Sequence, residues 1–240
     1  MFKFFGGEKP QIPNEVPFQK LEKIGEGKYS EVNIPINDPD LVVKVARTKW
    51  KKGEEGVHPL ADPNRIKADL DILNENFGEY VPNSQLVIGK NERGEKTVYT
   101  IQERIDGTNL DNLKYDEHIA EQLKSFLNRV IDTYINNLVY YGNDPRPQSI
   151  FPDLKGENFI FGKDKKRNDE DTKLYFIDTY PIEGTSAQDF VNGYIPMIRN
   201  RFSREWRKII DEFQKEATNR IRKYLEDNKD KIQRIPPTVM

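Results

Sequence analysis

The sequence predicts an α+β fold of two lobes, strand-rich over residues 1–105 and helical, but reduced, over residues 106–240. Short β-branched runs between turn residues fill most of the first hundred residues, and apolar residues at helical spacing fill most of the rest. The chain also has 240 residues with 13 Phe, 11 Tyr and 2 Trp, which is ample for a packed core. We therefore expect a cleft between the lobes, where ligands preferentially bind.

The elements of the first lobe follow from local patterns. Residues 18–36 read as two strands around a glycine-containing turn, and LVVKVA at 41–46 reads as a buried strand. Apolar residues at three- and four-residue spacing predict a helix over 64–77, with Pro63 placed to begin it. Residues 84–105 read as two strands joined by a polar turn.

The second lobe is predicted in the same way. One long amphipathic helix is expected over 116–139, with Asp116 as its N-cap. Residues 149–162 read as a loop followed by a strand, and 173–180 as the partner strand. A last helix is expected over about 203–232, with its aromatic and aliphatic stripe in the core.

Composition excludes several classes of function. The chain has no cysteine, which rules out disulfide scaffolds, cysteine zinc sites and thiol catalysis. The net charge of −2 gives no argument for a nucleic-acid partner. No apolar stretch has the length of a signal-peptide core or a membrane span. We therefore expect a soluble, cytoplasmic protein.

Two features of the first lobe can contact phosphate. Gly25, Gly27 and Ser30 lie between two strand-like runs, where glycines let backbone N–H groups approach phosphate oxygens; an ordinary hairpin turn explains them as well. Lys44 lies inside a buried-looking strand and needs a partner for its charge. Asp69 on the following helix is the candidate partner, and a solvent-facing edge lysine is the alternative.

Two features of the second lobe can carry out chemistry on a hydroxyl group and bind a metal. Asp153, Lys155 and Asn158 lie within FPDLKGEN, where a carboxylate can accept a proton, an ammonium can neutralise a phosphoryl oxygen and an amide oxygen can bind Mg²⁺. Asp178 ends an apolar strand, and a hairpin would bring it next to Asn158. A polar turn and a strand-ending Asp are the structural alternatives.

In this order and spacing the motifs resemble those of the protein kinase-like superfamily, of which the chain looks like an atypical, minimal member. IGEGKYSEV (24–32) resembles the family's Gly-rich loop, LVVK (41–44) its third-strand lysine, PDLKGEN (152–158) its catalytic loop and IDTY (177–180) its metal-binding strand end. YTIQERIDGTNL (99–110) resembles the fifth strand and the hinge.

The resemblance implies ATP and Mg²⁺ as cofactors and a role for each motif residue. The glycines and Ser30 would cover the phosphates, and Lys44, paired with Asp69, would contact the α- and β-phosphates. Asp153 would deprotonate the acceptor and Lys155 would stabilise the transferred group. Metal binding falls to Asn158 and Asp178, and adenine binding to the hinge at Gln102, Glu103 and Ile105.

Departures from the family pattern bear on the acceptor. Phe151-Pro152 replaces the usual His-Arg, Thr179-Tyr180 replaces Phe-Gly, and only eleven residues separate Asp178 from Asp189. The activation segment that docks peptides would be nearly absent, which resembles the aminoglycoside and choline kinases. Lys155, in contrast, matches the catalytic-loop motif of protein kinases, because the antibiotic and choline enzymes usually lack a lysine at this position. A non-peptide acceptor, a protein hydroxyl and transfer of AMP all remain open.

The resulting hypothesis is an ATP- and Mg²⁺-dependent phosphotransferase acting on a hydroxyl group. The alternative is a pseudokinase that serves as a nucleotide-binding or interaction module. A basic cluster at Arg199, Arg201, Arg204, Arg207 and Lys208 reads as a solvated helix face, with a seat for an anionic acceptor as its functional alternative.

Overall fold

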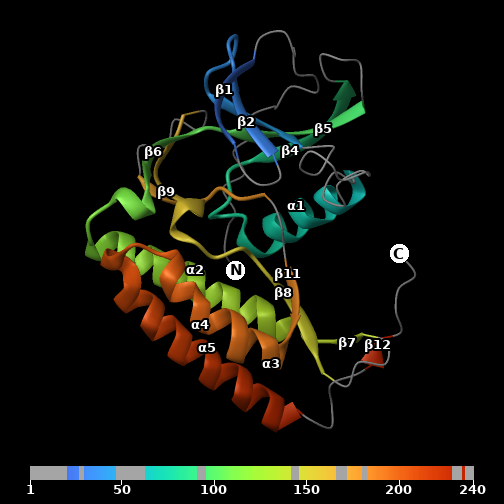
Figure 1. Cartoon of the computed structure of the whole chain (residues 1–240), viewed down its shortest axis with the longest axis vertical. Coiled ribbons are helices and arrows are strands. Elements are labelled where there is room, and N and C mark those ends of the chain that lie inside the picture. The colour runs from blue at the N-terminus through green and yellow to red at the C-terminus, as the bar shows by residue number, and fades with distance from the viewer. Residues whose placement is uncertain are drawn as a thin grey trace, which may run out of the picture.

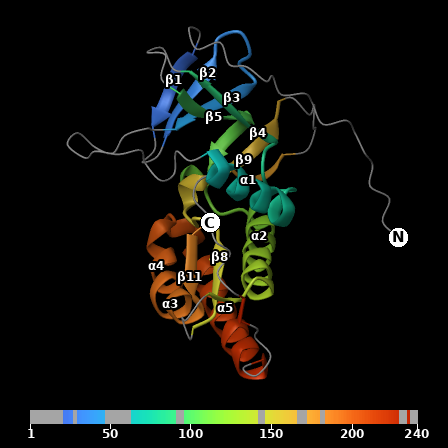
Figure 2. The same ribbon diagram turned by 90° about the vertical axis from the view of Figure 1, so that its right-hand side faces the viewer.

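The computed structural model describes residues 21–26, 30–46, 63–90, 96–141, 146–165, 172–179, 183–228 and 234–235. Over these residues the chain forms two lobes, with a sheet above and helices below (Figures 1 and 2). The predicted two-lobed α+β fold is confirmed by this arrangement.

The upper lobe contains a five-stranded antiparallel sheet in the order β1-β2-β3-β5-β4. Its central strand, β3, is the predicted LVVKVA run, in which Leu41 and Val43 are fully buried. Buried β-branched residues favour this central position. The strands are β1 (Leu21–Glu26), β2 (Ser30–Pro35), β3 (Leu41–Ala46), β4 (Ser84–Lys90) and β5 (Lys96–Glu103).

Helix α1 (Pro63–Phe77) lies between the sheet and the helical lobe (Figures 1 and 2). It begins at Pro63, as predicted. Ile66 and Leu70 pack against the sheet in one apolar cluster, whereas Leu73 and Phe77 belong to the core of the lower lobe. One apolar helix face therefore contacts both lobes.

A second, three-stranded antiparallel sheet in the order β10-β9-β6 connects the lobes. Its strands are β6 (Ile105–Asn109), β9 (Phe159–Asp164) and β10 (Lys173–Phe176). β9 and β10 confirm the predicted strand pair, but β6 was expected to be a linker. At the β6–β9 contact, a Cβ on Gly107 would lie 2.3 Å from the carbonyl oxygen of Phe161, so glycine permits this close pairing.

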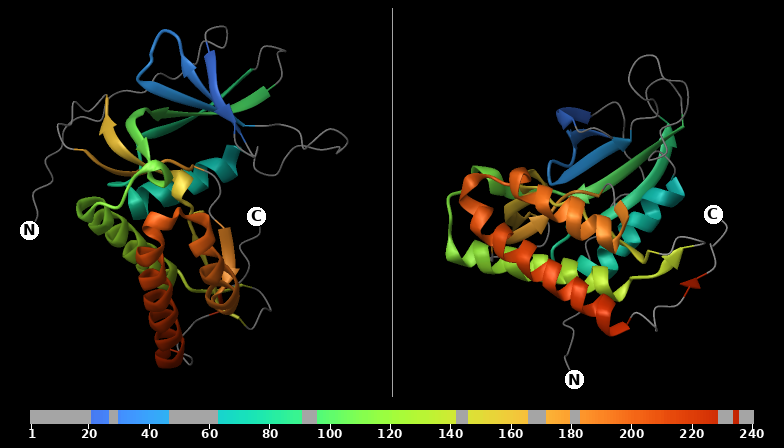
Figure 3. Two further views of the ribbon diagram at one scale, coloured as in Figure 1. Left: turned by 60° about the vertical axis from the view of Figure 1, so that its left-hand side comes forward. Right: turned by 60° about the horizontal axis from the view of Figure 1, so that its bottom comes forward.

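The lower lobe is built around α2 (Glu117–Asn136) and α5 (Arg207–Asn228), which pack side by side (Figures 1 and 3). Asp116 is the N-cap of α2, as predicted, and its carboxylate accepts a hydrogen bond from the Ile119 N–H at 3.1 Å. The predicted last helix begins as a single 3₁₀ turn, η7 (Arg204–Trp206), before α5. The largest apolar core lies between these helices and the second sheet.

Shorter elements complete the lower lobe. β8 (Gln148–Phe151) pairs antiparallel with β11 (Glu183–Ser186), although residues 149–151 were expected to be a loop. A helical run with changing hydrogen-bond pattern then leads toward α5. The elements not yet named are η3 (Leu110–Asn112), β7 (Tyr140–Tyr141), η4 (Gly156–Asn158), α3 (Ala187–Asp189), the π-helix η5 (Phe190–Tyr194), α4 (Ile195–Ile198), η6 (Arg199–Arg201) and β12 (Arg234–Ile235).

Within the described parts of the chain, no helix has both the length and the apolar character needed to cross a bilayer.

Candidate active site

A cavity of about 830 Å³ lies between the two lobes. Residues from six separate stretches of the sequence line it, including all the predicted site residues except Gly27 and Asp69. Gly27 lies outside the described residues. The sequence motifs therefore converge on one place, as predicted, and the cavity is large enough for a nucleotide-sized ligand.

The roof of the cavity comes from β1, β2 and β3. Gly25 and Ser30 both line it, and a Cβ added to Gly25 would meet no heavy atom of the described residues within 4 Å. The backbone at Gly25 is therefore open to a ligand. Ile24, Val32 and Val42 add apolar surface beside it, opposite Ile160 and Ile177 of the lower lobe. Sequence reasoning missed this apolar slot, because no local pattern pairs these five residues.

Lys44 reaches across the cavity toward the lower lobe. Its side chain is only 7% exposed, and its ammonium donates hydrogen bonds to the carbonyl oxygen of Ile177 and, at 3.5 Å, to Thr179 Oγ1. Burial lowers its pKa to about 8, although the negative charge of Asp178 acts in the opposite direction. Lys44 therefore lies beside the predicted metal-binding strand end.

The predicted ion pair between Lys44 and Asp69 is not formed, and this expectation was wrong for the structure described here. Asp69 is 8% exposed, and its Oδ2 atom has no hydrogen-bond partner among the described residues. Burial raises its pKa to about 6, with Arg65 opposing the rise. An Asp side chain is one methylene shorter than Glu, and the Lys44 ammonium is already held by Ile177 and Thr179.

The catalytic-loop residues and Asp178 form one hydrogen-bonded group. The side-chain amide of Asn158 donates to the backbone oxygen of Asp153 at 2.8 Å and to Asp178 Oδ2 at 3.0 Å. The backbone N–H of Ile177 also donates to the Asn158 carbonyl oxygen at 2.8 Å. The strand pair β9–β10 thus brings Asn158 and Asp178 together, as the predicted hairpin requires.

Asp153 lies between two cations. Lys155 Nζ is 3.7 Å from its Oδ2 atom, and the Arg201 guanidinium is 2.5 Å from its Oδ1 atom. Lys155 also contacts Glu157 at 2.6 Å. Burial acts to lower the pKa of Lys155, but the hydrogen bond to Glu157 and the nearby carboxylates raise it above its ordinary value. Lys155 is thus kept charged beside Asp153.

Arg201 was predicted only as part of a basic cluster, either a solvated helix face or a seat for an anionic acceptor, and its place beside Asp153 was not predicted. Two further contacts place it: its Nη1 atom lies 3.4 Å from the Tyr194 hydroxyl, and its guanidinium lies over the Tyr194 ring at 5.9 Å. That same hydroxyl accepts a hydrogen bond from the Leu154 backbone N–H at 2.9 Å. Tyr194 therefore links Arg201 to the loop that carries Asp153. No local signal reveals this, since Tyr194 follows Leu154 by 40 residues.

The hinge residues line the far end of the cavity. Gln102 and Glu103 are buried, and Ile105 begins β6. The Gln102 amide donates to Ser84 Oγ at 3.1 Å, and the Glu103 backbone N–H donates to the Asn83 carbonyl oxygen at 2.9 Å. The hinge is therefore fixed to the start of β4 by hydrogen bonds.

The oxygen atoms of Asn158 and Asp178 suit Mg²⁺ only if oxygen atoms of a bound ligand complete its coordination. No cluster of three or more His, Cys, Asp or Glu side chains suited to a metal occurs in the described ranges. Asp178 offers a carboxylate, and Asn158, whose amide N–H groups are donated, offers its amide oxygen. Mg²⁺ typically binds one or two protein oxygens together with phosphates and waters, so these residues fit that cation.

Comparisons with known proteins give structural likeness alone. No protein-family model and no curated protein sequence matches the chain. A structure of aminoglycoside 2'-phosphotransferase-IIIa in complex with GDP is 15% identical, with a TM-score of 0.45, over 90% of this chain and 94% of that chain. The Rio2 kinase–ADP/Mg²⁺–phosphoaspartate complex from Chaetomium thermophilum is 12% identical, with a TM-score of 0.39, over 91% of this chain and 59% of that chain. A structure of WaaP in complex with acyl carrier protein is 14% identical, with a TM-score of 0.42, over 88% of this chain and 83% of that chain.

The chain thus has a two-lobed α+β fold, and its central cavity is lined by the segments whose motifs resemble those of the protein kinase-like superfamily.

Proposed function

We propose that this protein is an ATP- and Mg²⁺-dependent phosphotransferase that transfers the γ-phosphoryl group to a hydroxyl acceptor. One observation carries the proposal: Lys44, Asp153, Asn158 and Asp178 come from three separate segments of the chain and line one cavity. Side chains of this kind, placed together between two lobes, suit phosphoryl transfer, which needs positioning and charge neutralisation more than covalent chemistry.

In this proposal the upper lobe holds the nucleotide. The adenine ring lies in the apolar slot between Val42 and Ile177, with its polar edge toward the backbone of Glu103 and Ile105. Gly25 and Ser30 cover the phosphates, and Lys44 turns from the Ile177 carbonyl to the α- and β-phosphate oxygens.

The lower lobe supplies the chemistry. Asp153 accepts the proton of the acceptor hydroxyl as its oxygen forms a bond to the γ-phosphorus, and the bond to the bridging oxygen breaks with its electron pair on ADP. Lys155 neutralises charge on the transferred group. Asn158 and Asp178 would hold Mg²⁺, which when bound neutralises charge on the β- and γ-phosphates.

The deciding experiment measures Mg²⁺-dependent ATP consumption by the purified chain and by Asp153→Asn and Asp178→Ala. We expect both variants to lose at least about a hundredfold in turnover, while still binding a non-hydrolysable ATP analogue in the Asp153→Asn case. Mass analysis of the products separates phosphoryl transfer from AMP transfer. Unchanged turnover in both variants would rule the mechanism out.

A pseudokinase is the second candidate, and one observation favours it: Asp69 leaves Lys44 without the carboxylate partner expected on α1. Such a protein would bind the ATP analogue with no product at any acceptor. The same assay therefore separates the two functions, because nucleotide binding is common to both and only the enzyme consumes ATP.

A further inference from the structure

A second cavity, of about 560 Å³, adjoins the first on the lower-lobe side of Asp153. The two cavities share Lys155, Glu157 and Arg201 as lining residues. Asp153 lines only the first cavity, whereas its two cationic partners, Lys155 and Arg201, line both. The second cavity is the place from which an acceptor hydroxyl could reach the catalytic carboxylate.

The two acidic residues of the second cavity both have partners within the protein. Asp111 is used within the fold, since its Oδ1 atom accepts a hydrogen bond from the Ser203 backbone N–H at 2.8 Å. Glu157 is paired with Lys155 at 2.6 Å. Glu157 is therefore neutralised by Lys155, and one oxygen of Asp111 is occupied by a hydrogen bond within the fold.

Arg201 has hydrogen-bond donors to spare. A guanidinium carries five N–H donors, and in the described parts of the chain Arg201 makes one contact with Asp153 and one with the Tyr194 hydroxyl. Its side chain is 33% exposed, and it lines both cavities. Donors in this planar fork match the two oxygens of a carboxylate or phosphate.

The backbone holds Arg201 in place. Arg201 is the last residue of the 3₁₀ turn η6, and the residues on either side of this turn, Ile198 and Phe202, are both buried in the large core. Phe202 packs against Phe159, with ring centroids 6.0 Å apart. Burial on both sides fixes the main chain of Arg201. The contacts with Asp153 and Tyr194 hold its guanidinium beside the loop that carries Asp153.

We propose that the phosphoryl acceptor is a small molecule that carries an anionic group, phosphate or carboxylate, near its reactive hydroxyl, and that Arg201 binds this group. The proposal rests on the proposed phosphotransferase function. When the acceptor arrives, its anion takes the free donors of Arg201, and its hydroxyl lies against Asp153. A cationic acceptor would instead meet Lys155 and Arg201 with like charge.

The test uses inorganic phosphate and, separately, acetate as probes. Each is titrated by calorimetry into the full chain saturated with Mg²⁺ and a non-hydrolysable ATP analogue, at constant ionic strength. We expect at least one anion to bind in the millimolar range, and to bind at least about tenfold more weakly to Arg201→Gln. Arg201→Lys, which keeps the charge but loses the fork, should bind with intermediate affinity.

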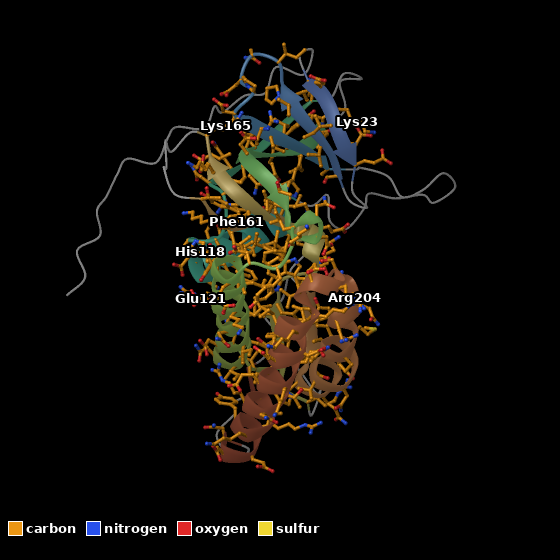
Figure 4. All side chains as sticks on the ribbon, turned by 90° about the vertical axis from the view of Figure 1, so that its left-hand side faces the viewer. Lys23, His118, Glu121, Phe161, Lys165 and Arg204 are labelled. Carbon is orange, nitrogen blue, oxygen red and sulfur yellow. The ribbon has the colours of Figure 1, made fainter. Side chains whose placement is uncertain are left out.

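The matched control is Arg204→Gln, which removes the same charge three residues away. Arg204 is exposed, lies at the outer edge of the helical lobe (Figure 4) and lines neither cavity. Anion affinity within about twofold of the parent is expected for this variant, since its charge is screened by solvent.

Two results would overturn the inference: equal anion affinity in the parent and Arg201→Gln, or no anion binding by a chain that binds the ATP analogue. Retained analogue affinity in Arg201→Gln shows that this variant is folded. A parent chain that fails to bind the analogue would instead count against the proposed phosphotransferase function, so the two failures are distinguishable.

Discussion

The buried carboxyl group of Asp69 lies in an environment that disfavours its charge. Its neighbours in the cluster beneath the sheet are Ile66 and Leu70, and its Oδ2 atom has no hydrogen-bond partner among the described residues. Because burial raises its pKa to about 6, the folded state holds its proton more tightly than the unfolded chain does. Ionisation of Asp69 therefore costs folding free energy near neutral pH.

The substitution Asp69→Asn should stabilise the protein at pH 7. As pH rises from about 4 to 6, the unfolded chain ionises at Asp69 before the folded chain does, so the parent loses stability over this window and the Asn variant does not. Allowing for partial solvation, we expect a gain of about 1–2 kcal/mol at pH 7 and almost none at pH 4. Urea unfolding at the two pH values measures it; an equal effect at both would contradict the argument.

The proximity of several candidate site residues was predictable, whereas some of their partners were not. Asp153, Asn158 and Asp178 were found from spacing and residue type, and the structure brings them within one hydrogen-bonded group. Arg201 was named only within a basic cluster, and its pairing with Asp153 was not predicted, because Asp153 lies 48 residues earlier and only the path of the chain through η6 brings them together. Local sequence patterns therefore identify residues with suitable chemistry, but contacts between residues far apart in the sequence depend on tertiary packing.

Elements were predictable where their signal is local. The starts of α1 and α2 follow from Pro63 and Asp116, since a fixed φ and a capping carboxylate act within one turn of the helix. β6 and β8 were missed, because each is a strand only through a partner elsewhere in the chain, β9 and β11 respectively. Their sequences, IDGTN and QSIF, are too short to show strand periodicity.

The element most tightly constrained is the catalytic loop at η4. A Cβ added to Gly156 would lie 1.9 Å from Asp111 Oδ1, so the carboxylate occupies the space that any other residue would need. That carboxylate also accepts the hydrogen bond from the Ser203 N–H. Gly156 thus lets one carboxylate of η3 join the catalytic loop to the turn between Arg201 and α5.

Gly156→Ala should therefore displace Asp111 and destabilise the fold by about 1–3 kcal/mol, as overpacking of a closed site does. The control is a double-mutant cycle with Asp111→Ala, which removes the carboxylate that the new methyl group would meet. The effects should not add, with a coupling of at least about 1 kcal/mol in favour of the double variant. Unfolding free energies of the four proteins measure this, and additive effects would show that the contact is not the cause.

At the scale of the whole molecule, one aromatic cluster joins the lobes. Phe126 of α2 lies within 5.2 Å of Phe77 of α1 and within 5.4 Å of Phe176 of β10, measured between ring centroids. The Phe176 backbone N–H also donates to the Tyr80 carbonyl oxygen at 2.8 Å. The end of α1 is thus anchored to the lower lobe. The five-stranded sheet, in contrast, is separated from that lobe by the cavity that residues of both lobes line.

A nucleotide in that cavity should bind both lobes and so stabilise the molecule as a unit. With Mg²⁺ and a non-hydrolysable ATP analogue at about a hundred times its Kd, we expect about 2.7 kcal/mol of added stability, which for this length is a rise in Tm of about 5–10 °C. Lys44→Met, on the upper lobe, and Asp178→Ala, on the lower lobe, should each remove most of that rise at the same analogue concentration. Differential scanning calorimetry provides the measurement, with Arg204→Gln as the variant expected to keep the full shift. If only the upper-lobe variant lost the rise, the nucleotide would be held by the sheet alone, and the placement of Asp178 at its phosphates would be wrong.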